Sequence, residues 1–351
     1  MFHQIFQRIP RTTEILAVIG IISSLCLSAP AQDASVLFHN DFETYALNGV
    51  TRVAVSREIG GRTHVGLVNL GTGEWFDMTE YLDQTYNDPG NDRWLAVSND
   101  LTYYIMESER SGFNGWSGLV WGTFNANGEP SKPKAVDGTV HPEGHGSISK
   151  NGTHIAITIR SEIGNGRNDI LLLERNGDVW DRSKDITISA ASGRSDDEPQ
   201  FSVDGSKIIW TSSNNWNAGG DAVVFAENNL SGNAYKELMN ASRLGPSAKM
   251  LRPSYQADGK IVFEGEVSGE YCYRWDPKTP GSDPVIINSS YRNDNSCAAL
   301  PDGRIVSYWM ERSGSAGHEL RVMLSNGQHL AVLQPGVDFW DFPLSGGTAS
   351  Q

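Results

Sequence analysis

The sequence has a shortage of basic residues relative to acidic ones. It contains 28 Lys and Arg against 42 Asp and Glu, for a formal net charge of −14 at pH 7, and no segment concentrates Lys and Arg. Proteins bind nucleic acids chiefly through clustered Lys and Arg at the phosphates. This composition therefore argues against a nucleic-acid partner.

Several motifs that mark common enzyme classes are also missing. There is no Gly-x-Ser-x-Gly elbow, no phosphate-binding loop, no dinucleotide fingerprint and no calcium loop of the EF-hand type. A hydrolase built on a nucleophilic Ser elbow and redox chemistry with a nucleotide cofactor are thus disfavoured.

Long apolar runs are scarce, and the only prominent one lies near the N-terminus. Arg8 and Arg11 precede the apolar run Ile15–Ile22, and small residues follow up to Ala31. This order is typical of a secretory signal peptide, here residues 1–31. The alternative is an uncleaved membrane anchor, although the run is short of the roughly 20 residues that span a bilayer. No later segment is apolar enough to span a membrane, so we expect an exported protein, periplasmic or secreted.

Six turns of the Asn/Asp-Gly type divide the remaining sequence at a regular spacing of 44 to 54 residues. They are Asn48-Gly49, Asn99-Asp100, Asn151-Gly152, Asp204-Gly205, Asp258-Gly259 and Asp302-Gly303. Such residues tolerate the positive φ angles of tight hairpin turns. Each turn is followed by a run rich in β-branched and aromatic residues, as in Thr153–Ile157 and Ser206–Trp210. These patterns predict a strand, a turn and a second strand in every unit.

A second turn follows in each unit, clearest at Asn127-Gly128, Asn176-Gly177 and Asn326-Gly327. Two hairpins per unit make four antiparallel strands, and a repeat of this length built from short strands is typical of a β-propeller blade. The sequence therefore predicts an all-β fold, a six-bladed β-propeller formed by residues 32–351 as a single domain. A segment around Phe342–Gly347 is predicted to close the ring with N-terminal sequence. The alternative is a seven-bladed ring whose last blade is shared by the two termini.

One unit carries a more specific pattern. Phe201–Ser212, preceded by Asp197-Glu-Pro199, resembles the repeat of TolB-like propellers, in which a Pro and an aromatic residue precede Ser-x-Asp-Gly and a hydrophobic strand. Pro253–Gly259, Ser147–Gly152 and Leu300–Gly303 keep parts of it. The resemblance implies the six-bladed TolB-like fold. Such propellers include scaffolds, binding proteins and enzymes, so the resemblance does not select a function.

The chain has three cysteines, and one of them, Cys26, lies within the predicted signal peptide. Cys272 and Cys297 remain, in neighbouring units. An exported protein meets an oxidising compartment, so this pair forms either a disulfide between blades or two buried free thiols.

The segments that enter the innermost strands are rich in polar residues, and propeller ligands usually bind where such segments converge. Candidate ligand-binding residues here are Arg93, Arg194, Arg252 and Arg292. The last three precede consecutive inner strands and could converge on an anion such as a uronate carboxylate. The alternative is that each Arg pairs with a nearby Asp.

The segment His141-Pro-Glu-Gly-His145 places two imidazoles and a carboxylate within five residues. His141, Glu143 and His145 are candidate ligands for a divalent cation, and the two histidines are candidate catalytic residues if the protein is an enzyme. The alternative is a structural loop in which the histidines bond to neighbouring backbone.

Two tryptophans lie in Gly/Asn-rich stretches outside the predicted strands. Trp116 and Trp216 could present flat surfaces to a sugar ring, or could instead seal the gaps between blades.

Two functions fit these observations. The first is a monomeric, non-enzymatic exported propeller that binds a protein or a glycan at its axial face. The second is a metal-assisted lyase acting on uronate-containing polysaccharides. In that enzyme His141 and His145 would serve as base or metal ligands, and Arg194, Arg252 and Arg292 would hold the carboxylate.

Overall fold

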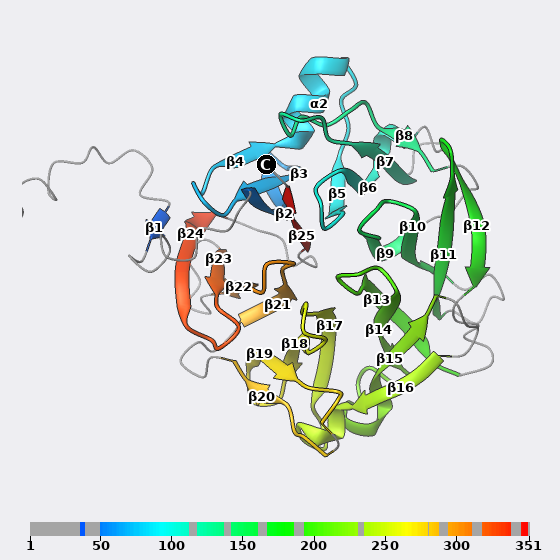
Figure 1. Ribbon diagram of the computed structural model, residues 1–351, viewed down its shortest axis with the longest axis vertical. Coiled ribbons are helices and arrows are strands. Elements are labelled where there is room, and N and C mark those ends of the chain that lie inside the picture. The colour runs from blue at the N-terminus through cyan, green and yellow to red at the C-terminus, as the bar shows by residue number, and fades with distance from the viewer. Residues whose placement is uncertain are drawn as a thin grey trace, which may run out of the picture. The chain divides into compact units, whose positions relative to one another are not determined.

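Six antiparallel sheets are arranged around a central axis (Figure 1). The computed structural model describes residues 36–38, 50–111, 118–136, 142–160, 167–185, 193–230, 235–279, 281–287, 294–310, 318–337 and 345–349. The predicted signal peptide lies outside these residues. Within them, no helix is both long and apolar enough to cross a membrane.

Each sheet is one blade, and we give its strands from the axis outward. Blade 1 contains β25 (Ser345–Ala349), β2 (Val50–Ile59), β3 (Arg62–Asn69) and β4 (Trp75–Asp77). Blade 2 contains β5 (Asp92–Val97), β6 (Tyr103–Ser108), β7 (Gly118–Thr123) and β8 (Lys134–Ala135). Blade 3 contains β9 (Pro142–Ile148), β10 (His154–Arg160), β11 (Asn168–Asn176) and β12 (Val179–Asp185).

The second half of the ring repeats this order. Blade 4 contains β13 (Ser195–Phe201), β14 (Lys207–Ser213), β15 (Val223–Asn229) and β16 (Tyr235–Asn240). Blade 5 contains β17 (Lys249–Tyr255), β18 (Ile261–Glu266), β19 (Glu270–Trp275) and β20 (Val285–Ile286). Blade 6 contains β21 (Asp294–Ala299), β22 (Ile305–Met310), β23 (His318–Met323) and β24 (His329–Val337), with β1 (Val36–Phe38) added at its outer edge.

The six-bladed fold predicted from the turns is confirmed. The turns at Asn99, Asn151, Asp204, Asp258 and Asp302 each join the first strand of a blade to its second. The turn at Asn48-Gly49 lies outside the described residues.

The ring is closed by strands from opposite ends of the sequence. β25 pairs antiparallel with β2, with Val50 opposite Ala349 and Ala54 opposite Ser345. This pairing completes blade 1, so the structure has six blades and does not support the seven-bladed alternative. It also agrees with the predicted closing segment, which starts a few residues earlier in the sequence.

Aromatic and aliphatic side chains fill the spaces between blades. Between blades 4 and 5, the ring of Phe225 meets that of Phe263 edge to face with centroids 5.0 Å apart, and Phe263 stacks on Tyr273 at 5.5 Å. All three side chains are buried. Since burying a large apolar side chain contributes roughly 1.5–3 kcal/mol, each blade depends on its neighbours for its stability.

The inner strands contain β-bulges, which the sequence did not predict. In β5, β13, β17 and β21 the pairing with the second strand shifts register. Within each shift lies a non-glycine residue with positive φ: Trp94 at 50°, Glu198 at 60°, Arg252 at 53° and Ser296 at 51°. This conformation is unfavourable for residues with a Cβ, so tertiary contacts must hold it.

The helix α2 (Met78–Tyr86) was also not predicted. Asp77 caps its N-terminus by accepting a hydrogen bond from the Glu80 amide at 2.9 Å. Asp83 on this helix pairs with Arg110, whose guanidinium also lies 3.0 Å from the fully buried carboxylate of Asp92 on β5. These ion pairs join the helix between blades 1 and 2 to the inner strand of blade 2. Three short 3₁₀ turns complete the described elements: η2 (Glu109–Ser111), η3 (Gly220–Ala222) and η4 (Ala241–Arg243).

Candidate functional site

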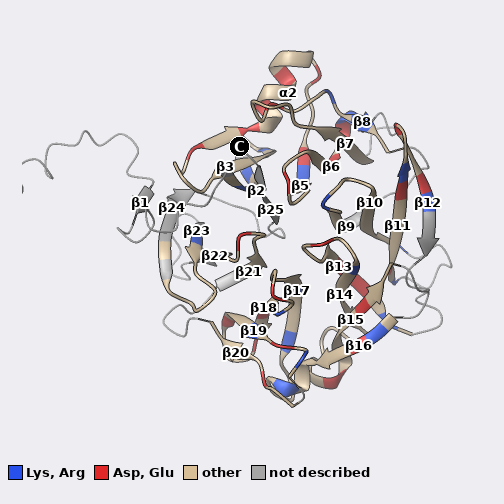
Figure 2. Cartoon of the chain, viewed as in Figure 1, with Lys and Arg blue, Asp and Glu red and all other residues tan. Residues whose placement is uncertain are grey.

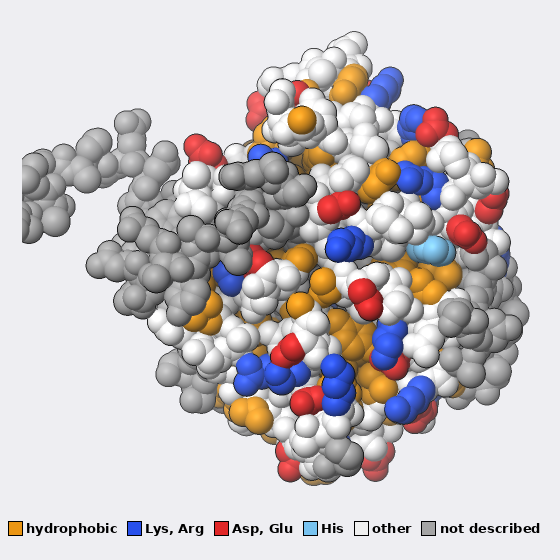
Figure 3. Space-filling model, in the orientation of Figure 1, with side chains coloured by type: hydrophobic (Ala, Val, Ile, Leu, Met, Phe, Trp, Pro, Cys, Tyr) orange, Lys and Arg blue, Asp and Glu red, His pale blue; other side chains and the backbone are white. Residues whose placement is uncertain are grey.

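The two ends of the ring carry different connections, because consecutive connections of an antiparallel blade alternate between the ends. The connections from first to second strand and from third to fourth strand lie at one end, which we call the turn face. The other end holds the connections from second to third strand and the starts of the inner strands. Figure 3 views the molecule along the axis and shows hydrophobic side chains near the centre, with charged groups around them.

A small hollow opens at the centre of the turn face, where the inner strands end. We call it the mouth. It has a volume of about 30 Å³, and five consecutive blades contribute to its lining. Its lining includes Val97, Ile148, Val203, Tyr255 and Pro301, one from each of blades 2 to 6. The hollow is large enough for the tip of one inserted side chain.

Hydrogen bonds fix the rim of the mouth. The Asn99 side-chain amide donates to the Val203 carbonyl oxygen at 3.2 Å, which joins the turns of blades 2 and 4. The Ala299 amide donates to the Ser254 hydroxyl at 3.1 Å and joins blades 6 and 5. The mouth is therefore held in shape before any ligand arrives.

Below the mouth, a chain of polar contacts runs through the bulges of the inner strands. The Glu198 amide lies 3.3 Å from the Thr158 hydroxyl, which accepts its hydrogen bond. The Glu198 carboxylate accepts a hydrogen bond from the Arg252 amide at 2.8 Å, and its other oxygen lies 3.1 Å from Arg252 Nε. Arg252 Nη1 donates to Glu264 at 2.7 Å, and the same Glu264 oxygen accepts from the Ser296 amide at 2.8 Å. We call these five residues the inter-blade network, since they come from blades 3, 4, 5 and 6.

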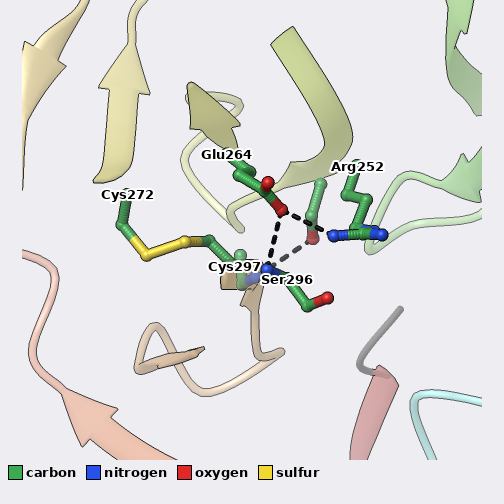
Figure 4. Close-up of a disulfide and its surroundings, with 7 residues drawn as sticks. Arg252, Glu264, Cys272, Ser296 and Cys297 are labelled. Carbon is green, nitrogen blue, oxygen red and sulfur yellow. Dashed lines mark hydrogen bonds and ion pairs between the residues drawn. A yellow bond between two sulfur atoms is a disulfide. The ribbon is translucent and has the colours of Figure 1, made fainter. Parts of the chain in front are cut away.

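The inter-blade network is buried, so its charges are held away from bulk water. Glu198 is 5% exposed, Glu264 is 2% exposed, and the side chain of Arg252 is 13% exposed. Figure 4 shows the Arg252 guanidinium and the Ser296 amide converging on Glu264. The positive charge of Arg252 offsets part of the negative charge of the two carboxylates.

Cys272 and Cys297 form a disulfide beside the inter-blade network (Figure 4). Their Cα atoms are 5.7 Å apart, and both residues are 1% exposed. The bond joins the third strand of blade 5 to the inner strand of blade 6, and Cys297 directly follows Ser296 in that strand.

Two of the predicted Arg residues, Arg252 and Arg194, make different contacts in the described part of the structure. Arg252 contacts Glu198 and Glu264 inside the ring. Arg194 donates to the Ala222 carbonyl oxygen at 3.0 Å and lies 3.5 Å from Glu237, at the end opposite the turn face.

Arg93 and the remaining predicted residues occupy other positions. Arg93 is half-buried on β5 and makes no hydrogen bond or ion pair among the described contacts. Trp216 packs against the apolar cluster between blades 4 and 5. Arg292, His141 and Trp116 lie outside the described residues. Glu143 and His145 belong to β9, but their side chains lie outside the described part of the structure.

The metal-site hypothesis rests on side chains in that undescribed part. Among the described residues, no group of three His, Cys, Asp or Glu side chains is close enough together to hold a metal ion.

Sequence reasoning missed Glu198 and Glu264 as partners of Arg252. Glu198 belongs to the Asp197-Glu-Pro199 repeat pattern, which by itself predicts no role for this side chain. Glu264 follows apolar residues in its strand, and a charged residue at such a position indicates a buried ion pair.

Comparisons with known proteins agree with the fold. No family model matches the chain, and no curated protein is similar to it in sequence. Among solved structures, TolB from Acinetobacter baumannii is similar with a TM-score of 0.59 and 16% identity, over 90% of this chain and 68% of that one. A puromycin-hydrolyzing peptidase from Mycobacterium tuberculosis is similar with a TM-score of 0.52 and 12% identity, over 81% of this chain and 44% of the peptidase.

The protein is therefore a six-bladed β-propeller with a small mouth at the centre of the turn face. Within that class, its fold is TolB-like. At these identities the likeness concerns the fold and leaves the ligand open.

Proposed function

We propose that this chain is an exported, non-enzymatic binding propeller whose turn face receives a segment of another protein at the mouth. The observation that carries the proposal is the construction of the mouth from five consecutive blades. A side chain inserted there contacts elements held rigidly by the ring, so little ordering of the propeller opposes binding.

The chemistry of the mouth favours a polypeptide over a glycan. Its lining combines apolar residues such as Val97 and Pro301 with polar ones such as Gln200 and Ser254, which suits a polypeptide, because its side chains and backbone offer both kinds of group. Sugar recognition favours exposed aromatic platforms. Of the two tryptophans predicted to act as platforms, Trp216 is partly buried against an apolar cluster and Trp116 lies outside the described residues.

Nothing in the described residues favours the lyase hypothesis. Arg252, which was predicted to hold a uronate carboxylate, is already paired with two carboxylates of the protein. The predicted base and metal ligands lie in the part of the chain that is not described.

A substitution at the mouth tests the proposal. We expect Val203→Arg to weaken binding of peptides selected from a random phage-displayed library by about tenfold or more, because the longer side chain fills the small hollow and brings a charge into it. Peptides selected against the wild-type protein would be measured by fluorescence anisotropy, with melting temperature as the check on folding.

Val267→Arg is the matched control for this experiment. Val267 lies between β18 and β19, at the end opposite the turn face, and is 51% exposed, so the same substitution is tolerated there. Equal affinities of the two variants, or failure to select any binding peptide, would contradict the proposed function.

Export is tested by the N-terminus of the mature protein. The signal-like pattern of residues 1–31 and the Cys272–Cys297 disulfide both support passage into an oxidising compartment. We expect mass spectrometry of the exported protein to show Gln32 as its first residue. An Ala31→Leu variant should accumulate unprocessed, and a wild-type chain that keeps residues 1–31 in the membrane fraction would instead indicate an anchor.

A further inference from the structure

A second and larger cavity lies on the turn face between blades 4 and 5, and we call it the inter-blade pocket. Its volume is about 400 Å³, within the range of pockets that bind small molecules or single side chains. The β13–β14 and β17–β18 turns, β15, β16 and the turn before β20 contribute to its lining. Tyr255 lines both this pocket and the mouth, so the two cavities adjoin.

Three Lys side chains line the pocket, and their charges are incompletely compensated. Lys236 makes no hydrogen bond or ion pair among the described contacts. Lys278 donates to the Asp258 carbonyl oxygen at 2.9 Å, which is a neutral acceptor. Lys207 lies 3.0 Å from Glu227, and its side chain remains 41% exposed.

The carboxylates around the pocket are already occupied by donors of the protein itself. Glu227 accepts hydrogen bonds from Lys207 and from the Tyr255 hydroxyl. Asp204 accepts from the Ser202 hydroxyl at 2.6 Å and from the Ser206 amide at 3.0 Å. These hydrogen bonds, that of Ser202 foremost, lower the pKa of Asp204 to about 2.

The Asp258 carboxylate is also held by donors of the protein itself, and the buried side chain of Gln256 has unused hydrogen-bonding capacity. Asp258 accepts from the Lys260 amide at 3.0 Å and pairs with the Lys260 ammonium. Gln256 lines the pocket and is only 5% exposed, and its side-chain oxygen Oε1 is buried without a hydrogen-bond partner among the described contacts. A buried acceptor without a partner is unfavourable, so Gln256 favours a ligand that carries a donor, such as a backbone amide, beside its carboxylate.

We propose that the inter-blade pocket binds a carboxylate of a polypeptide ligand. This inference rests on the proposed function, since the polypeptide would be the one whose neighbouring side chain enters the mouth. The pocket presents Lys236 and Lys278 as cations without a carboxylate partner among the described contacts, while Glu227 and Asp258 are paired with Lys207 and Lys260. Leu238, Ala257 and Pro277 line the same pocket and suit the methylene groups that carry such a carboxylate.

Small carboxylates test the pocket without requiring a peptide at the mouth. The probes are N-acetyl-glutamate N-methylamide, its glutamine analogue, N-acetylglycine and inorganic phosphate. The readout is NMR of the full chain with its lysines ¹³C-dimethylated, a modification that keeps their positive charge. Replacing each lysine in turn by Arg assigns the signals.

We expect the glutamate probe to shift the signals of Lys207, Lys236 and Lys278 saturably and to leave that of Lys150 unchanged. Lys150 is the matched control because it lies exposed in the β9–β10 turn on the same face and does not line the pocket. Equal responses to the glutamate and glutamine probes, or equal shifts of all lysines, would overturn the proposal. So would a response to phosphate as large as that to the carboxylates. A stronger response to N-acetylglycine than to the glutamate probe would identify a C-terminal carboxylate as the group bound.

A pair of variants separates this inference from the proposed function. Lys236→Met should weaken binding of the glutamate probe by about threefold to fivefold, which is the effect of losing one partly exposed ion pair. Lys150→Met should not change the affinity of this probe. If selected peptides lose affinity with Val203→Arg but not when their own Glu and Asp are changed to Gln and Asn, the mouth proposal stands and the carboxylate inference fails. If no peptide is selected and the probe still binds through Lys236, the proposed function fails and the pocket remains an anion site.

Discussion

Arg252→Met is expected to lower the free energy of unfolding by about 3 to 5 kcal/mol. The substitution keeps much of the side-chain volume but leaves Glu198 and Glu264 without the cation between them. Because both carboxylates are buried, removing their shared cation withdraws a compensating charge from a poorly solvated site, which is far costlier than breaking a surface pair. Urea denaturation followed by tryptophan fluorescence measures the loss.

Arg243→Met is the matched control for that measurement. Arg243 also pairs with one carboxylate, Asp283, at 3.0 Å, but the Asp283 side chain is 78% exposed. We expect this variant to lose about 1 kcal/mol or less. Adding Glu198→Gln and Glu264→Gln to Arg252→Met should recover part of the lost stability, since it removes the uncompensated charges. A loss with Arg252→Met no larger than with Arg243→Met would show that the inter-blade network is not a major source of stability.

Replacing both Cys272 and Cys297 by Ala is expected to cost about 3 kcal/mol. The disulfide links residues 25 apart in sequence, and a crosslink over a loop of this size restricts the unfolded chain by roughly that amount. Both positions are buried, so Ala avoids placing a polar group in the core. The measurement is again the urea unfolding curve, under non-reducing conditions.

Reductant provides the internal control for the disulfide. It should shift the wild-type curve toward that of the double variant and leave the double variant unchanged. Finding two free thiols in the unreduced, unfolded mature protein would contradict the bond. Since Cys297 follows Ser296, whose amide donates to Glu264, the cost of removing the disulfide and that of Arg252→Met should not simply add.

The parts of the fold that were predictable are those set by local sequence. Turns at Asp204-Gly205 and Asp258-Gly259 follow from the backbone preferences of these residues, and the strands beside them follow from β-branched and aromatic composition. Their regular spacing was enough to predict six blades and a closing segment.

The bulges were not predictable because no local signal requires them. Trp94, Glu198, Arg252 and Ser296 are four different residue types, and none of them favours positive φ. In Glu198, Arg252 and Ser296, the residue with positive φ donates its backbone amide to a side chain of the preceding blade. In particular, Arg252 contacts Glu198, which lies 54 residues earlier in the chain.

The candidate site, too, was only partly predictable from the sequence. The sequence indicated Arg252 as noteworthy but suggested a ligand or a nearby Asp as its partner, whereas the structure supplies two Glu side chains. The mouth and the inter-blade pocket depend on how five turns meet in space, which a single sequence with no contact information does not specify.

The pairing of β25 with β2 also constrains when the ring becomes complete. Val50 and Ala349 are brought together across almost the whole described chain, and contacts of such large sequence separation form late because closing a long loop costs entropy. A growing or translocating chain that has delivered only its first five blades lacks the inner strand of blade 1. The edge of β2 then stays open, and the ring closes only when the segment Ser345–Ala349 arrives.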